Sequence, residues 1–435
     1  MKKRLRLSIR LMILAFIFLN IITCHAVSNR GLSNNMPCAI DLKQGNLNVK
    51  AASAITLDGE NNVILYSKSS NKKIYPASSG KVLTAITALE NSNLNDVVTV
   101  SQNALKGQEN GGSHIALKKG EKISMEDALH GLLLASGNDC AIAIAEHVSG
   151  SEKKFAVLMN KTAKKIGCKN THFITSSGLF DKNHYTTAYD LALITSYGLK
   201  NPDFKQILSQ IKYTIKPTNK HKKKVVLYNN HKMTRYKYRY YPGIIGGKRG
   251  YITESRFNLI TAACRKKLTL ITVVCRGDSL IENCEDTKKM LDFFFKSYKV
   301  YKYKPKFKQL LKSDDTIIKY SKPEKKSANL VVPVKAHLTN ENIKTSFTKY
   351  SNLSYPVEKL SKIGEITLSY RGVILGKIAV IAEKKIESPE VTALKTGILG
   401  LTLLLILIPT ALITGHFKIK KSGYPKAVQK KRIKR

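Results

Sequence analysis

A serine hydroxyl and a lysine amine lie three residues apart in the segment Ser78-Ser79-Gly80-Lys81. Pro76 cannot continue a helix upstream of this segment, and residues 81–90 are apolar with helical spacing. We therefore expect a helix to begin here, and residues i and i+3 share one face of a helix. Lys81 can then reach Ser78 and act as the base that activates it for attack on a carbonyl group. The amino terminus of the helix adds N–H groups and a positive field that favour a developing oxyanion.

Two further polar segments carry hydroxyl, amide and cationic side chains of the kinds found in catalytic sites. Ser136-Gly137-Asn138 separates two apolar segments with helical spacing, and Lys248-Arg249-Gly250 opens a β-rich run. Each also has a purely structural interpretation, the first as a turn between helices and the second as part of a surface strand. Ser-x-x-Lys alone is equally ambiguous, because many helices begin with serine. The occurrence of all three in this order favours a single site.

The elements that must position these residues follow the order strands, helices, strands and a closing helix. Asp58-Gly59 separates two strand-like runs and is typical of a hairpin. Ser124-Met125-Glu126-Asp127 resembles a capping box ahead of a helix. We expect helices at residues 81–90, 128–134, 141–148, 155–166 and 286–295, and strands at 52–57, 62–66, 259–263 and 268–274. This order predicts an α+β domain over residues 45–298.

From about residue 302 the sequence changes to short β-like runs, at 329–334, 363–370 and 373–382. Apolar and polar residues alternate in the second run, and Arg371-Gly372 marks a turn before the third. We expect a small β-rich domain over residues 303–387. The 435 residues are enough for these two domains and for two apolar segments near the ends of the chain.

Both ends of the chain predict contact with a membrane. Basic residues precede the apolar run 11–22, and small residues follow it, so residues 1–26 read as a secretory signal peptide. An uncleaved anchor is the alternative, and a lipid anchor on Cys24 is disfavoured by the preceding Thr23. Residues 396–415 carry no charge and are long enough to cross the ~30 Å hydrocarbon core as a helix. The basic tail 416–435 then lies in the cytoplasm, and the body of the chain lies outside.

The formal net charge of +44 is the main compositional signal. Such a charge is typical of proteins with anionic partners, but the export signal argues against nucleic acid. Anionic lipids, anionic wall polymers and a merely solvated lysine-rich surface remain open, and the basic residues are densest at 221–224 and 235–239. The seven cysteines form no Cys-x-x-Cys pair and the ten histidines no His-Glu-x-x-His arrangement, so we expect no metal and no other cofactor.

The three polar segments, in this order, resemble the motifs Ser-x-x-Lys, Ser-x-Asn and Lys-Thr-Gly of the low-molecular-mass penicillin-binding proteins, the serine D-alanyl-D-alanine carboxypeptidases. The surrounding sequence is similar as well, over about residues 45–298 and more loosely to 387. The similar segments are Leu133-Leu134-Ala135-Ser136-Gly137-Asn138-Asp139, Ser177-Gly178-Leu179 with His184, Thr187-Ala188-Tyr189-Asp190-Leu191-Ala192, and Tyr241-Pro242-Gly243-Ile244-Ile245-Gly246-Gly247-Lys248. The resemblance implies a penicillin-binding/β-lactamase-like fold, an antiparallel sheet flanked by helices.

The resemblance also implies roles for individual residues. Ser78 is expected to be the nucleophile and Lys81 the base, with a pKa lowered by burial and by the nearby Lys248 cation. Ser136 is expected to relay a proton to the leaving D-alanine, and Asn138 to hold the substrate amide and orient the base. The other expected substrate-binding residues are Lys248 and Arg249 for the terminal carboxylate, Gly250 beside them, and Tyr251, whose backbone N–H forms an oxyanion hole with that of Ser78.

Arg249 departs from the motif, which normally has a hydroxyl residue at this position. Arginine also binds carboxylates, and in bidentate fashion, but it is longer than threonine and must fold back. Thr253 lies four residues further on, about 13 Å along an extended strand, so it cannot simply replace the hydroxyl. The departure bears on substrate preference and rate more than on identity.

The expected function is removal of the terminal D-alanine from peptidoglycan stem peptides outside the membrane, through an acyl-enzyme that β-lactams also form. The predicted location is the cell membrane, with the catalytic domain on the extracytoplasmic side. A scaffold protein that binds penicillin but turns over weakly is the alternative, motivated by Arg249. A β-lactamase fits the membrane helix and the β-rich domain less well.

Overall fold

The computed structural model describes residues 47–109, 112–235, 239–313 and 315–420. The expected signal peptide and most of the basic tail lie outside these ranges. The described residues divide into two compact units, of which the first comprises those up to 304 together with 327–344 and 368–377, and the second the others.

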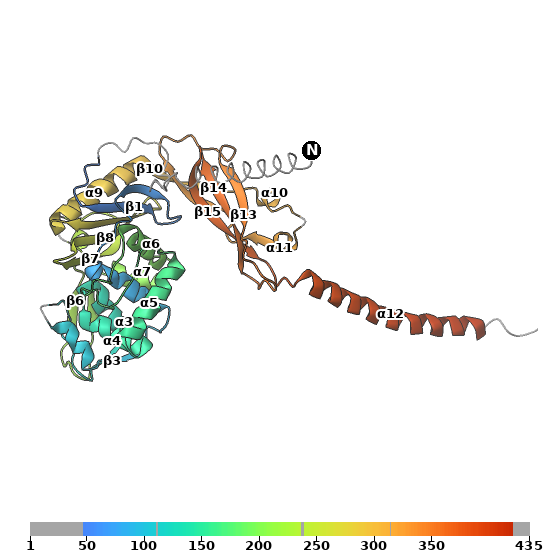
Figure 1. Ribbon diagram of the computed structural model, residues 1–435, viewed down its shortest axis with the longest axis horizontal. Helices are drawn as coiled ribbons and strands as arrows, with labels where there is room; N and C mark the ends of the chain where they lie inside the picture. Colours follow the sequence, from blue (N-terminus) through green and yellow to red (C-terminus); the bar gives the residue numbers. More distant parts are fainter. Residues whose placement is uncertain (1–46, 110–111, 236–238, 314, 421–435) are drawn as a thin grey trace, which may run out of the picture. The chain divides into compact units, whose positions relative to one another are not determined.

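A five-stranded antiparallel sheet organises the first unit, in the order β2-β1-β9-β8-β7 (Figure 1). The strands are β1 (Ser53–Asp58), β2 (Ile64–Lys68), β7 (Ile244–Ile252), β8 (Arg256–Arg265) and β9 (Leu268–Gly277). The hairpin predicted at Asp58-Gly59 is confirmed, because β1 pairs with β2 across it. Side chains alternate between two cores, since Ile55 and Val273 belong to one buried cluster, and Ala54 and Val274 to the other.

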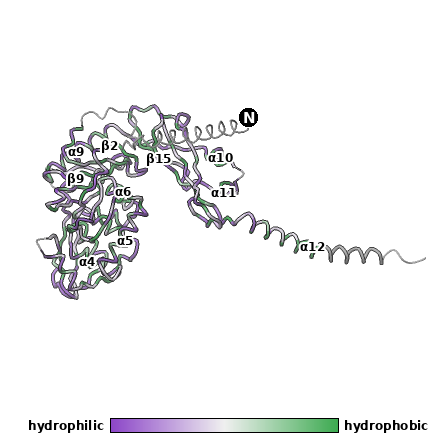
Figure 2. The backbone as a smooth tube through the Cα atoms, viewed as in Figure 1, coloured by the Kyte–Doolittle hydropathy of each residue, from purple (hydrophilic) through white to green (hydrophobic). Residues whose placement is uncertain are grey.

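Helices cover both faces of this sheet. α9 (Leu280–Ser297) packs against β8 and β9 on one face, and α6 (Ala188–Gly198) packs against β1 and β9 on the other. The closing helix predicted at 286–295 is thus confirmed and is longer at both ends, because Ser279 caps it six residues earlier than expected. Both hydrophobic and hydrophilic colours occur along these elements (Figure 2). Nine of the eleven residues of α6 are buried, whereas α9 buries one face that includes Met290, Leu291 and Phe294.

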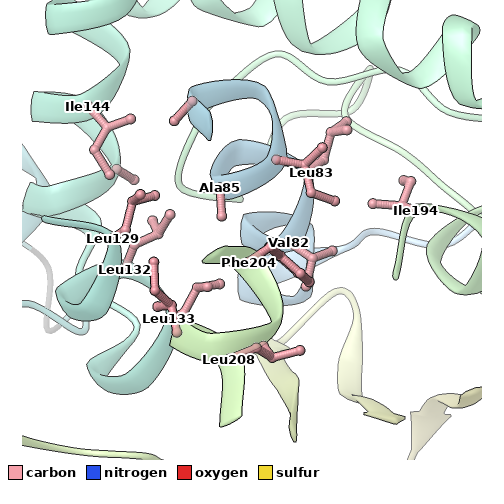
Figure 3. Packing of buried hydrophobic residues seen from close by; sticks show 14 of the residues in the cluster. Val82, Leu83, Ala85, Leu129, Leu132, Leu133, Ile144, Ile194, Phe204 and Leu208 are labelled. Atoms are coloured by element: carbon pink, nitrogen blue, oxygen red, sulfur yellow. The ribbon is translucent and has the colours of Figure 1, made fainter. Parts of the chain in front are cut away.

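The remaining helices of this unit pack around α2 (Lys81–Leu89). They are α3 (Met125–His130), α4 (Asn138–Ser149), α5 (Glu152–Ile166) and α7 (Pro202–Ser209). Val82 and Leu83 of α2 are fully buried. Figure 3 shows Leu83 on the side of Ile194, and the leucines of α3 and the following turn on the other side of α2, near Ala85. The predicted cap at Ser124 is present, since its hydroxyl accepts the backbone N–H of Asp127. The helix that carries the Ser-x-x-Lys segment is therefore held rigidly in the main core.

Short paired strands complete the first unit. β3 (Val97–Thr99) pairs with β4 (Lys122–Ser124), β5 (Lys212–Ile215) with β6 (Val225–Tyr228), and β10 (Tyr298–Tyr303) with β12 (Ala328–Pro333). The run predicted at 329–334 therefore forms a strand, but it pairs with β10 instead of joining the sheet of the β-rich domain. The six-pair antiparallel register places buried residues opposite one another at both ends, Tyr298 opposite Pro333 and Tyr303 opposite Ala328. Short helical segments also occur: η2 (Asn103–Gln108) and α8 (Lys232–Arg235).

A four-stranded sheet follows, in the order β11-β15-β14-β13. Its strands are β11 (Ser321–Pro323), β13 (Lys344–Lys349), β14 (Lys362–Tyr370) and β15 (Val373–Ala382), with the short helices α10 (Phe307–Leu310) and α11 (Thr316–Lys319) before it. The two runs predicted at 363–370 and 373–382 are confirmed as β14 and β15. The helix α12 (Pro389–Lys420) follows the four-stranded sheet in the sequence. Among the residues that the structure describes, no helix meets the combined length and apolarity needed for a membrane span.

Candidate active site

Ser78 lies in a short 3-10 helix, η1 (Ala77–Gly80), directly before α2. The helix predicted at residues 81–90 is confirmed as α2, and the 3-10 turn that carries the serine precedes it. A 3-10 helix has three residues per turn, so residues i and i+3 are aligned one above the other. This geometry brings the Lys81 Nζ to 2.8 Å from the Ser78 Oγ. The predicted pairing of hydroxyl and amine is present.

The turn that carries Ser78 is strained and closely enclosed. Ala77 has φ +47, a left-handed conformation that costs a residue with a side chain about 1–3 kcal/mol. Gly178 approaches from one side, where an added Cβ would lie 2.1 Å from the Ala77 carbonyl oxygen, and Gly250 of β7 approaches from the other, where a Cβ would lie 2.8 Å from that of Pro76. Neither position can hold a side chain without moving the turn. Gly250 therefore contributes close approach of β7 to the nucleophile.

Lys81 is completely buried and has three hydrogen-bond partners. Its Nζ lies 2.8 Å from the Ser78 Oγ, 2.7 Å from the Asn138 Oδ1 and 2.6 Å from the Ser177 carbonyl oxygen. Burial lowers the pKa of Lys81 to about 7, although neighbouring acidic groups oppose this shift. The amine is therefore neutral in a substantial fraction of molecules near neutral pH, as a base must be.

The segment 136–138 acquires its shape from an irregular helix end. After α3 the chain forms a π-helical turn, Gly131–Ala135, and Ser136 follows with φ +68. The Asn138 backbone N–H then donates to the Ser113 carbonyl oxygen at 2.7 Å as α4 begins. The structure places Ser136 and Asn138 on the same cavity as Ser78. The alternative interpretation as a plain turn between helices describes the backbone but not this convergence.

Sequence reasoning gave no role to several groups that shape this site. The Asp139 carboxylate is fully buried and accepts the backbone N–H groups of Ile115 and Leu117, at 3.2 and 3.1 Å, which fixes the loop beside the cavity. The Glu152 carboxylate binds the N–H and hydroxyl of Ser176, next to the carbonyl that contacts Lys81. Asp139 adjoins the second motif, which was the available signal. No sequence signal marks Glu152, because its partner lies 24 residues away.

Lys248 lies on β7, at the edge of the sheet that faces η1, and is completely buried. It forms no ion pair with any acidic residue in the part of the chain that the structure describes. Burial, followed by repulsion from Lys81 and Arg249, lowers the pKa of Lys248 well below its usual range. The repulsion between the two amines, which was expected to lower the pKa of Lys81, thus lowers the pKa of Lys248 instead. An incoming carboxylate would favour the charged form of this amine.

The cavity beside these residues has a volume of about 740 Å³. Six of the predicted residues line it, whereas Lys81 and Lys248 lie buried behind its wall; the six are Ser78, Ser136, Asn138, Arg249, Gly250 and Tyr251. Tyr251 is 54% exposed, and its ring centre lies 4.4 Å from that of Phe257. Thr253, Ser113 and Asn230 also line the cavity and were not predicted to do so. Arg249 is half-buried and is opposite Leu259 in the sheet.

The chain is similar in sequence to known proteins of one family. Residues 41–279 match the peptidase family S11, described as D-alanyl-D-alanine carboxypeptidase. The chain is 29% identical to D-alanyl-D-alanine carboxypeptidase DacF of Bacillus subtilis, over 78% of the chain and 86% of the relative. It is 30% identical to the D-alanyl-D-alanine carboxypeptidase of a Streptomyces species, over 57% and 88%.

The fold is shared with solved structures as well. Penicillin-binding protein 5 from Haemophilus influenzae superimposes with a TM-score of 0.59 at 23% identity, over 78% of this chain and 98% of that one. This likeness confirms the predicted α+β fold of penicillin-binding/β-lactamase type. Since the family match covers more than half of the chain, the protein belongs to the serine D-alanyl-D-alanine carboxypeptidases of family S11.

Proposed function

We propose that this protein removes the terminal D-alanine from peptidoglycan stem peptides, with the residues of the cavity in the roles given below. The observation that carries this proposal is the contact of 2.8 Å between the Ser78 Oγ and a completely buried Lys81 whose pKa is about 7. A serine paired with an amine that is neutral in a substantial fraction of molecules can attack a carbonyl group. The names of the relatives support an enzyme over a non-catalytic scaffold.

The reaction proceeds in two halves. Ser78 attacks the carbonyl carbon of the penultimate D-alanine while its proton passes to Lys81. The backbone N–H groups of Ser78 and Tyr251 bind the oxyanion. Ser136 delivers a proton to the nitrogen of the departing D-alanine and takes up the proton held by Lys81, so the Lys81 amine becomes neutral again. Lys248 and Arg249 hold the terminal carboxylate. Water, deprotonated by Lys81, then attacks the acyl-enzyme and releases the shortened peptide, which restores the Ser78 hydroxyl.

The test is to incubate the full-length chain, in detergent, with a peptide that ends in D-Ala-D-Ala and to measure free D-alanine. A fluorescent penicillin, followed by peptide mapping, should label Ser78 in the same preparation. Labelling without release of D-alanine would favour the scaffold protein. Rapid hydrolysis of the β-lactam, with no release of D-alanine, would favour a β-lactamase instead.

Arg249→Thr restores the hydroxyl that the family motif has at this position. We expect this variant to keep its acylation by penicillin and to change peptide turnover by no more than about a hundredfold, since one charge-assisted contact contributes ~1.5–3 kcal/mol. The guanidinium of Arg249 in the wild-type protein is too basic to serve as acid or base near neutral pH. Steady-state kinetics should show that Arg249→Ala raises the Michaelis constant more than it lowers kcat. Loss of penicillin labelling in a folded Arg249→Thr protein would contradict this role.

Membrane attachment is a second part of the proposal, and it is supported by the sequence. Residues 396–415 are uncharged, and the lysines and arginines that follow favour a cytoplasmic tail. External protease on intact protoplasts should therefore digest the body of the protein and leave residues 418–435 protected, as detected with an antibody against the tail. Digestion of the tail under these conditions would show that the orientation is wrong. A chain truncated after residue 387 should be released from the membrane fraction.

A further inference from the structure

Two segments of the first unit, residues 112–124 and 212–228, carry nine lysines and a single acidic residue. Over the whole chain the ratio is much lower, 74 basic residues to 30 acidic ones, so these segments stand out even in a basic protein. All nine lysines are exposed. They form what we call the lysine cluster: Lys118, Lys119, Lys122, Lys212, Lys216, Lys220, Lys222, Lys223 and Lys224.

The structure joins the two segments through their one acidic residue. Glu121 is only 1% exposed, and its carboxylate lies 2.8 Å from both the Thr218 hydroxyl and the His221 Nδ1. Asn219 adds a second link, because its Oδ1 accepts the backbone N–H of Lys122 at 2.8 Å. The tip of the β5–β6 hairpin is therefore fastened to the turn before β4. Nearly a hundred residues of sequence separate the two groups of lysines that this contact gathers.

The positive charge of the lysine cluster is not neutralised within the described part of the chain. None of the nine lysines forms an ion pair with an acidic residue there, because Glu121 is turned inward to Thr218 and His221. Like charges this close repel one another, and an anionic partner would relieve the repulsion. The arrangement therefore has a physical cost that a bound polyanion removes.

We propose that the lysine cluster binds a flexible anionic polymer with regularly spaced phosphate groups, such as a phosphate-bearing polymer of the cell envelope. All nine cations are lysines, which act as mobile point charges, and none is an arginine suited to bidentate recognition of one group. The hairpin tip 216–224 and the turn 118–122 contain no phenylalanine, tyrosine or tryptophan. The exposed ring of Tyr228 lies on β6, with the Lys212 Nζ 5.9 Å from its centre. Stacking of successive bases needs more than this one ring. The hairpin tip and the turn also contain no large apolar residue that would insert into a lipid surface.

Short stretches of chain connect the lysine cluster to the wall of the catalytic cavity. Ser113 lines the cavity, and the chain reaches Lys118 five residues later. Asn230 also lines the cavity, six residues after Lys224, a distance of at most about 20 Å along an extended chain. A polymer bound to the cluster would thus hold the cavity close to the material that carries both polymer and substrate. Binding itself does not depend on catalysis, so its failure and the failure of the proposed activity are distinguishable.

The test compares two variants of the full-length chain that lose the same charge. One carries Lys→Gln at positions 119, 222, 223 and 224, and its control carries Lys→Gln at the exposed α5 positions 153, 154, 161 and 164. Binding to long-chain inorganic polyphosphate is measured between 50 and 200 mM salt. We expect the cluster variant to bind at least about tenfold more weakly than wild type at 50 mM salt. The slope of log affinity against log salt should become shallower by about 3, because each of the four lost lysine contacts contributes ~0.7 to it. The control should stay within about twofold of wild type.

Equal losses in the two variants would show that net charge alone drives binding, and would overturn the proposal. Tighter binding of single-stranded DNA or of anionic lipid vesicles than of polyphosphate, at equal phosphate concentration, would assign a different class of partner and would also overturn it. Penicillin labelling serves as the folding control, because none of the eight substituted lysines lines the cavity. A binding loss specific to the cluster variant, with labelling unchanged, supports the proposal.

Discussion

Ser78→Ala is expected to abolish covalent labelling by penicillin and to lower kcat for release of D-alanine by on the order of 10⁴-fold or more. Removal of a nucleophile has an effect of this size because the remaining groups cannot form the acyl-enzyme. The fold should survive the change. Lys81 keeps its contacts at 2.7 Å with the Asn138 Oδ1 and at 2.6 Å with the Ser177 carbonyl oxygen. Intact-mass spectrometry after exposure to penicillin measures the labelling, and circular dichroism checks the fold.

The neighbouring Ser79 supplies a matched control. Its hydroxyl is fully buried and donates to the Pro76 carbonyl oxygen at 2.5 Å, so it acts within the turn and does not line the cavity. Ser79→Ala should keep penicillin labelling while lowering the free energy of unfolding by about 1 kcal/mol, the usual value of one buried hydrogen bond. If labelling disappeared in Ser79→Ala and persisted in Ser78→Ala, then Ser79 and not Ser78 would be the nucleophile.

The pairing of Ser78 with Lys81 could be predicted from the sequence because it depends only on local geometry. A spacing of three residues brings the two side chains together in an α-helix and also in a 3-10 helix, so the 3-10 turn at Ser78 and the α-helix that begins at Lys81 give the same pairing. The hairpin at Asp58-Gly59 was predictable for the same reason, since its signal is contained in adjacent residues.

Contacts between distant segments could not be predicted in this way. The Ser177 carbonyl oxygen lies 96 residues from the amine that it contacts, and a backbone group leaves no trace in the sequence. The pairing of β12 with β10 is similar, because alternation predicts a strand at 329–334 but does not name its partner. The order of the three motifs supplied the long-range information that periodicity lacks. Asn230 and Ser113 belong to no motif, and their places on the cavity follow only from the fold.

The low pKa of Lys81 leads to the second large effect, which concerns pH. Burial lowers this pKa to about 7, so the neutral amine that accepts the Ser78 proton gains population as pH rises through 7. The second-order rate constant for acylation by penicillin should increase up to tenfold per pH unit below about 7 and level off above it. Stopped-flow fluorescence with a labelled penicillin, between pH 5 and 9, measures the profile.

The same depressed pKa affects stability with a definite sign. Between about 7 and the ordinary value of 10.5, the unfolded chain binds a proton at Lys81 that the folded protein does not. The free energy of unfolding should therefore rise with pH across this window through the contribution of Lys81. Lys248 contributes in the same direction, because its pKa is also lowered by burial. Part of this slope should disappear when Lys81 is replaced by a residue that does not titrate there, as measured by urea unfolding at pH 7 and pH 9.

Two substitutions at Lys81 separate its function as a base from its charge. Lys81→Met removes the amine, whereas Lys81→Arg keeps a cation that cannot lose its proton in this pH range. We expect both variants to lose on the order of 10²–10⁴-fold in the rate of acylation, the range for loss of a general base. Both should also lose the rise of that rate through pH 7. If the arginine variant acylated at close to the wild-type rate, then the positive charge beside Ser78 would be what matters, and proton transfer to Lys81 would not be part of the mechanism.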